Sequence, residues 1–118
     1  MPREWDTYTA AGGGCPVEKD LLKARLSKWE AGRLDEVQTM IAEGRGRPKI
    51  DFKYLRDGVS ECLVDGHNRT FRLFYADLNG GPFLLALHFI SKKKQNDRNA
   101  VNLAVKRLRD WLQRNPQP

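Results

Sequence analysis

Residues 69–90 form the most informative segment of the chain and read RTFRLFYADLNGGPFLLALHFI. Their first part, residues 69–77, is rich in β-branched and aromatic side chains, a composition typical of a strand. Asn79-Gly80 is the strongest short signal for a hairpin turn, so the next strand should return antiparallel. That strand, residues 83–90, is apolar on both faces. The segment therefore predicts an antiparallel hairpin whose second strand is central and fully covered.

Further strands are expected before this hairpin. A period of two in the hydrophobic pattern predicts strands at residues 52–56 and 59–64. Asp57-Gly58 and Asp65-Gly66 supply the turns that follow them. The four strands then form an antiparallel meander. The alternation in residues 4–8 indicates one more short strand near the N-terminus.

Helical spacing of apolar side chains marks the segment between the first strand and the meander. Pro16 suits the first turn of a helix, where its missing N–H costs nothing. The apolar period predicts a helix over residues 16–30. Gly32 interrupts the pattern, and a second apolar stripe over residues 34–41 predicts the other half of a helical hairpin.

The C-terminal segment also has a helical period. Asn96 or Asp97 can cap this helix, because their side chains accept from the N–H groups of its first turn. Its apolar face contains Ala100, Val101, Ala104, Val105, Leu108, Trp111 and Leu112. The order of elements predicts an α+β fold in one domain over residues 1–118. We expect an antiparallel sheet of four to five strands, with the N-terminal helix pair and the C-terminal helix on one face. The other face and its rim remain for binding.

The net charge of +6 is concentrated at one end of the chain. Residues 88–118 contain 8 of the 21 Lys and Arg side chains but 2 of the 15 Asp and Glu side chains, so residues 1–87 are neutral overall. A localised positive field favours a polyanion such as nucleic acid as the partner. A solvated basic helix explains the same charge equally well.

Several other classes of protein are disfavoured. The chain has neither an apolar N-terminal segment nor an apolar run long enough to cross a bilayer, so we expect a cytoplasmic protein with no membrane partner. Cys15 and Cys62 lie far apart in a sequence that shows no secretory segment, so we expect both to be reduced thiols. Together with His67 and His88 they show no short ligand spacing, so no zinc site is expected.

Arg72 is the most unusual residue of the predicted meander. It lies inside the run Phe71-Arg72-Leu73-Phe74-Tyr75, where an apolar side chain is the norm. Charged side chains inside apolar segments are rarely left unpaired. Arg72 therefore either pairs with Glu61 across the sheet or faces an anionic ligand.

His88 and the lysines after it are further candidates. Strict alternation places His88 on the strand face of Leu84, Ala86 and Ile90, where it is either a core residue or a functional one. Lys92-Lys93-Lys94 follow at the junction between strand and helix. They form either a solvated loop or a clamp for phosphate.

Three motifs, in order, resemble the phage-derived branch of the RelE/HigB toxin superfamily. They are Lys53-Tyr54-Leu55-Arg56-Asp57-Gly58-Val59-Ser60-Glu61, Phe71-Arg72-Leu73-Phe74-Tyr75 and Leu87-His88-Phe89-Ile90-Ser91-Lys92-Lys93-Lys94-Gln95, followed by a helix with Ala100, Ala104 and Arg107. They are similar in order and spacing to the family patterns K-x-L-x-D-G-L-x-E-L-R, R-x-x-Y and L-L-H-x-F-x-K-K-x-Q. The resemblance covers nearly the whole chain.

The resemblance implies a RelE-like fold and the toxin of a type II toxin–antitoxin pair, neutralised by a helix-turn-helix antitoxin. Such a toxin is a metal-independent endoribonuclease, without a cofactor, that cleaves mRNA, often in the ribosomal A site, and inhibits translation. The RNA 2′-oxygen attacks the neighbouring phosphorus, and fixed Arg and Lys donors stabilise the charge that grows on the phosphate oxygens.

The resemblance also implies roles for individual residues. Arg72 is the electrostatic clamp, Lys92 or Lys93 assists it or supplies the acid, and His88 acts as base or acid. The residues expected to hold RNA by its phosphates or bases are Lys53, Tyr54, Arg56, Arg69, Tyr75, Lys94 and Arg98.

The chain departs from the family pattern at one informative place. After Glu61 the family usually has Leu-Arg, whereas Cys62-Leu63 stand here. Either Arg69 substitutes for the missing sheet arginine from the next strand, or cleavage is weak or absent. Two other functions therefore stay open. One is a non-catalytic ParE-like toxin or inhibitor that binds a host protein, and the other is a small basic nucleic-acid-binding module.

Overall fold

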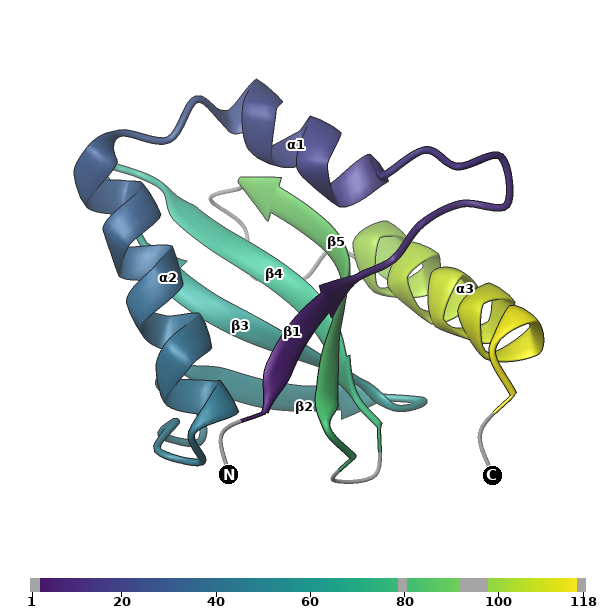
Figure 1. Ribbon diagram of the computed structural model, residues 1–118. Helices are drawn as coiled ribbons and strands as arrows, with labels where there is room; N and C mark the ends of the chain where they lie inside the picture. Colours follow the sequence, from purple (N-terminus) through teal and green to yellow (C-terminus); the bar gives the residue numbers. More distant parts are fainter. Residues whose placement is uncertain (1–2, 79–80, 92–97, 117–118) are drawn as a thin grey trace.

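A computed structural model describes residues 3–78, 81–91 and 98–116, and within them the chain forms five strands and three helices (Figure 1). In chain order the elements are β1 (Glu4–Thr7), α1 (Pro16–Ala24), α2 (Lys28–Ala42), β2 (Phe52–Arg56), β3 (Val59–Asp65), β4 (Thr70–Asp77), β5 (Phe83–Ser91) and α3 (Arg98–Arg114). The α+β class is confirmed, and each meander strand begins and ends within one residue of its predicted bounds. The Asn79-Gly80 turn and the caps at Asn96 and Asp97 lie outside the described residues.

The sheet is mixed rather than wholly antiparallel, and its strand order is β1-β5-β4-β3-β2. The strands β2 to β5 form the predicted antiparallel meander. The strand β1 instead runs parallel to β5, from Glu4 opposite Phe83 to Thr7 opposite Ala86. The expectation of an antiparallel sheet was therefore wrong for β1, because alternation in a short segment predicts a strand but not the direction of its partner. The helix pair carries the chain from this edge of the sheet to the opposite edge at β2.

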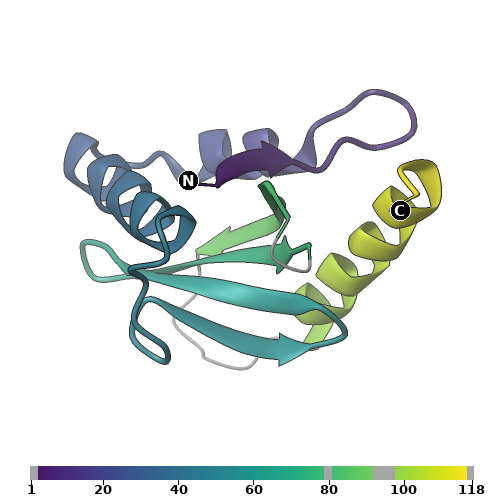
Figure 2. The same cartoon turned by 60° about the horizontal axis from the view of Figure 1, so that its bottom comes forward.

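Helices cover both faces of the sheet. On β4, Leu73 and Tyr75 pack in a core that includes side chains of α1 and α2, whereas Phe74 and Ala76 pack in a second core with α3. Figure 1 shows α2 and α3 on opposite sides of the strands, and Figure 2 shows α1 and α2, coloured blue, above the sheet with α3 set apart from them. The expectation that all helices share one face was wrong. Because β4 and β5 are apolar on both faces, each face needs a cover.

The break between α1 and α2 falls earlier than the sequence predicted. The helix α1 ends at Ala24, and Arg25 adopts a left-handed conformation with φ 48°. The side chain of Ser27 then accepts from Glu30 N at 3.1 Å, and the Glu30 carboxylate accepts from Ser27 N at 3.0 Å. This capping box satisfies two backbone donors, and Gly32 lies inside α2. A glycine inside a helix costs only about 1 kcal/mol, which the buried contacts of α2 offset.

Glu30 joins the helix pair to the turn between β3 and β4. Its carboxylate is almost fully buried and also accepts from His67 N at 3.0 Å and from the Arg69 guanidinium at 2.7 and 3.0 Å. Arg69 in turn donates to Ala24 O at 2.8 Å, at the end of α1. These hydrogen bonds, above all those from Arg69, hold the pKa of Glu30 far below its usual value. One buried carboxylate thus fixes three chain segments.

We predict that Glu30→Gln lowers the melting temperature at pH 7 well below that of wild type, because Arg69 loses its anionic partner. The folded-state pKa lies below the ordinary value of 4.5, so the ion contributes fully above that pH and its contribution declines as the pH falls below it. The difference in melting temperature between the variant and wild type should therefore become smaller at acidic pH. Thermal unfolding between about pH 7 and pH 3 measures this.

Glu36→Gln is the matched control, because Glu36 pairs with Arg33 on the surface of α2 and its side chain is 59 % exposed. Its melting temperature should stay close to wild type at every pH. A Glu30→Gln protein as stable as the Glu36→Gln protein at pH 7 would contradict the role given to Glu30.

Candidate functional site

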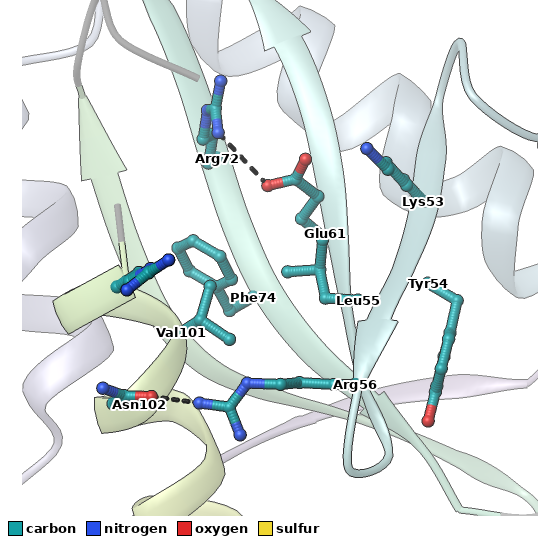
Figure 3. A pocket seen from close by; sticks show the side chains of 10 residues that line it. Lys53, Tyr54, Leu55, Arg56, Glu61, Arg72, Phe74, Val101 and Asn102 are labelled. Atoms are coloured by element: carbon teal, nitrogen blue, oxygen red, sulfur yellow. Dashed lines mark hydrogen bonds and ion pairs between the residues drawn. The ribbon is translucent and has the colours of Figure 1, made fainter. Parts of the chain in front are cut away.

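A cavity of about 420 Å³ lies between the strands β2, β3 and β4 and the first turns of α3. Cationic side chains predominate among its polar walls, which makes it a candidate anion site. Its lining residues are Lys53, Tyr54, Leu55, Arg56, Glu61, Arg72, Phe74, Arg98, Val101 and Asn102. Figure 3 shows side chains from β2, β3, β4 and α3 converging on this space.

Arg72 and Glu61 form the buried floor of the cavity. Arg72 Nη1 lies 3.5 Å from Glu61 Oε2, and the two side chains are 5 % and 8 % exposed. The sequence left open whether Arg72 pairs with Glu61 or faces an anionic ligand. The structure shows the pairing, and both side chains also line the cavity. An incoming anion would therefore meet Arg72 beside its carboxylate.

Burial changes the acidity of Glu61. Desolvation raises the pKa of this carboxyl above its usual value of 4.5, and the charges of Arg72 and Lys53 oppose that rise. Lys53 lies directly across from Glu61 in the register of β2 and β3. The carboxyl is therefore a better proton acceptor than an exposed glutamate, and it stands between two cations.

Arg56 links the sheet to α3 at the rim of the cavity. Its guanidinium donates to Asp57 Oδ2 at 2.5 Å and to the side-chain oxygen of Asn102 (Figure 3). Tyr54 also lines the cavity, with 62 % of its surface exposed, but its ring extends from the other side of β2, where its hydroxyl accepts from Gly58 N at 3.2 Å (Figure 3). The edge of the cavity at β2 therefore has a positioned cation and, on the outer side of the strand, an accessible aromatic ring.

Five of the predicted site residues line the cavity, and others lie elsewhere in the fold. The five are Lys53, Tyr54, Arg56, Arg72 and Arg98. Arg69 lies with Glu30 beside the helix pair, with its guanidinium 4.6 Å from the centre of the Phe71 ring. Tyr75 is buried on the face of α1 and α2, edge-on to Trp5 at 5.1 Å, where burial raises its pKa. Lys92, Lys93 and Lys94 lie outside the described residues.

His88 lies at the junction of α1, β5 and α3 rather than in the cavity lining. Its Nδ1 is 3.4 Å from Asp20 Oδ2 on α1 and 3.2 Å from Arg107 Nη1 on α3. Its ring stacks on Phe74 at 5.9 Å, on the sheet face where Ile90 also packs, whereas Leu84 and Ala86 pack in the core on the other face. Strict alternation was therefore right for Ile90 and wrong for Leu84 and Ala86. A bulge in β5 causes the change, because Phe74 pairs with His88 while Tyr75 pairs with Ala86.

Several residues of the cavity were not predicted as site residues. Glu61 was named only as a partner for Arg72, and Leu55, Phe74, Val101 and Asn102 were not singled out. Asn102 had a usable signal, because it follows Arg98 by four residues and so lies on the same face of α3. Leu55 had none, since it lies at an irregularity in the pairing of β2 with β3.

Comparison with protein-family models and with curated proteins finds no match. In the described parts of the chain, no three His, Cys, Asp or Glu side chains are grouped closely enough to hold a metal ion. No helix of those parts is long and apolar enough to cross a membrane. The functional interpretation therefore depends on the geometry of the cavity and on the motifs of the sequence.

We predict that Arg72→Met destabilises the fold by about 3 kcal/mol, because it leaves Glu61 buried without its cation. The double variant Arg72→Met/Glu61→Leu should recover most of this loss, since it removes both charges together. Denaturant unfolding of the two single variants and the double variant measures the coupling between the side chains. Additive effects would show that Arg72 and Glu61 do not act as a pair.

Proposed function

We propose that this protein is a RelE/HigB-like toxin of a type II toxin–antitoxin pair, an endoribonuclease that cleaves mRNA in the cytoplasm and inhibits translation. One observation carries the proposal. Lys53, Arg56, Arg72 and Arg98 line a single small cavity with one carboxylate, that of Glu61. A site of this kind suits a phosphodiester, which brings negative charge and needs both a clamp and a proton acceptor.

The cations of the cavity suit the transition state of RNA cleavage. When the 2′-oxygen attacks the phosphorus, negative charge grows on the two non-bridging oxygens. Arg72 is held by the strand and by Glu61, so its donors need little reorganisation during the reaction. Lys53 and Arg98 at the walls would hold the reacting phosphate and its neighbours.

Glu61 is the general base that this geometry supports best. It lines the same cavity as Arg72, and burial raises its pKa toward the range useful for proton transfer. Its carboxylate would take the 2′ proton while Arg72 faces the phosphate. His88 contacts Asp20 and Arg107 at the α1–α3 junction and stacks on Phe74, and it is not among the residues that line the cavity. Lys92 or Lys93 remains the proposed acid for the leaving 5′-oxygen.

Tyr54 is the proposed stacking residue for a base next to the cleaved bond. Its ring is exposed on the outer side of β2, next to the cavity, and its hydroxyl accepts from Gly58 N in the turn after the strand (Figure 3). Stacking on an exposed aromatic ring is sequence-tolerant and is a common way to hold single-stranded RNA. Specificity for a particular codon would then come from additional contacts, such as those with the ribosome.

A second function is favoured by one specific observation. Leu63 lies directly across from Arg72 in the register of β3 and β4, where the family usually has an arginine. An apolar residue at this position weakens the positive field of the cavity. The alternative is therefore a non-catalytic toxin of the same fold that binds a host protein, as ParE-like toxins do. In both cases the proposed intracellular partner is a helix-turn-helix antitoxin.

Cell-free translation with the purified protein tests the first function. Primer extension should reveal cuts in the translated mRNA, and Glu61→Gln should lower the cleavage rate by about 10²-fold or more because the proton acceptor is lost. Arg72→Lys should lower it by about 10²-fold, because a single ammonium cannot replace the guanidinium fork. Arg45→Gln, at an exposed site paired with Glu43, is the control and should cut like wild type.

Growth measurements distinguish the second function. Induced wild-type protein that arrests growth without producing cuts, and Glu61→Gln protein that arrests growth equally well, would contradict an RNA-cleaving enzyme and support a binder of a host protein. Circular dichroism is needed to check that each variant is folded.

We also predict a pH profile that reports Glu61. A general base works in its deprotonated form, so the single-turnover cleavage rate should fall as the pH drops through the raised pKa of Glu61. That acid limb should begin above the usual glutamate value of 4.5. The Glu61→Gln variant should cleave slowly, and its rate should no longer fall at acidic pH. An unchanged limb in the variant would assign the base to another residue.

A further inference from the structure

A second, smaller cavity of about 260 Å³ adjoins the first along α3. Its lining residues are Arg56, Asn102, Val105, Lys106 and Arg109. Arg56 and Asn102 also line the larger cavity, and the hydrogen bond between them lies at the boundary of the two spaces. The cavities are therefore two parts of one groove between β2 and α3.

The walls of the smaller cavity contain three cations and no carboxylate. One of these cations, Arg56, is paired with Asp57, whereas Asp110, beside Arg109 in sequence, accepts from Arg114 and Tyr8. Lys106 and Arg109 are both exposed. An anion entering this space would meet the cations Lys106 and Arg109 beside the Asn102 amide, with the paired Arg56 at its border.

The cations of α3 divide into two groups with different surroundings. Arg107 donates to Leu87 O at 2.9 Å, and Arg114 donates to Thr9 O and to Asp110, so these two hold α3 to the rest of the protein. Lys106 and Arg109 instead line the groove. Two cations of α3 therefore anchor the helix, and two others face a cavity.

The spacing of the groove residues suits a polymer with regularly repeated charges. Arg98, Asn102, Lys106 and Arg109 follow one another at intervals of four, four and three residues, so they lie along one face of the helix. From Arg98 to Arg109 the helix rises about 16 Å. That length exceeds one phosphate group and accommodates several successive nucleotides.

We propose that the smaller cavity is a second phosphate-binding subsite, in which Lys106 and Arg109 hold the backbone of a single RNA strand that continues from the larger cavity along α3. The proposal rests on the proposed RNA function and adds the path of the substrate. Contacts with phosphates position the strand without reading its sequence. Arg56, at the boundary, contacts the phosphate between the two subsites.

Binding of uncleavable RNA of two lengths tests this path. A 2′-O-methylated strand of twelve nucleotides reaches both subsites, whereas a 2′-O-methylated dinucleotide has a single phosphate. Lys106→Ala/Arg109→Ala should weaken binding of the long strand by about tenfold at low salt and leave the dinucleotide affinity nearly unchanged. The slope of log K against log salt for the long strand should flatten by about 1.4, because two phosphate contacts are lost.

Lys23→Ala/Lys28→Ala is the matched control, because it removes two charges from exposed positions on α1 and α2 away from the groove. Its affinities and salt slope should stay close to wild type. Fluorescence anisotropy measures the long strand, and NMR chemical-shift titration measures the dinucleotide.

Three results would overturn the inference, and they are distinguishable. If wild type binds the long strand and the groove variant loses no more than the control, the second subsite is wrong while the RNA function stands. If both RNAs lose affinity equally in the groove variant, the two cavities act as one site. If wild type binds neither RNA, the proposed RNA function is wrong, and the second subsite is wrong with it.

Discussion

The buried pair of Arg72 and Glu61 links the fold to the site. Arg72 lies on β4, a strand with covers on both faces, where a charged side chain is costly unless a partner and hydrogen bonds compensate it. Glu61 supplies that partner from β3. The apolar part of this sheet face, including Val59 and Ala76, is covered by α3. The charged part borders the cavity instead, so the position of the pair determines where the site can form.

Local signals in the sequence predicted the meander strands. They could not predict pairing between strands that are far apart in the chain. The strand bounds follow from alternation and from turns such as Asp57-Gly58, which act over a few residues. The direction of β1 depends on its pairing with β5, about eighty residues away in the chain. The sequence carries the Ser-x-x-Glu signature of a capping box at Ser27, but the break in the helix pair was predicted at Gly32. The doubly apolar β5 already indicated covers on both faces, although the expected architecture placed all helices on one.

Sequence periodicity predicted the site residues that lie on regular parts of strands and helices. Lys53, Arg72 and Arg98 meet because the pairing of β2, β3 and β4 is regular around Glu61 and because α3 begins beside them. Arg69 has the same chemistry, yet the buried Glu30 holds it beside the helix pair. His88 depends on a bulge, which has no reliable signature in one sequence. Alternation along a strand therefore predicts which face a side chain occupies only as far as the first bulge.

The chemistry of the cut ends tests the central claim most directly. If the cavity directs the 2′-oxygen to the neighbouring phosphorus, purified protein with translated mRNA must leave a 5′-hydroxyl on one fragment and a cyclic or 3′-phosphate on the other. Replacing the nucleotide at the cut by its 2′-deoxy form must then abolish cleavage at that bond. Fragments with 5′-phosphate ends, or cleavage of the deoxy substrate at the same rate, would contradict this account of the site.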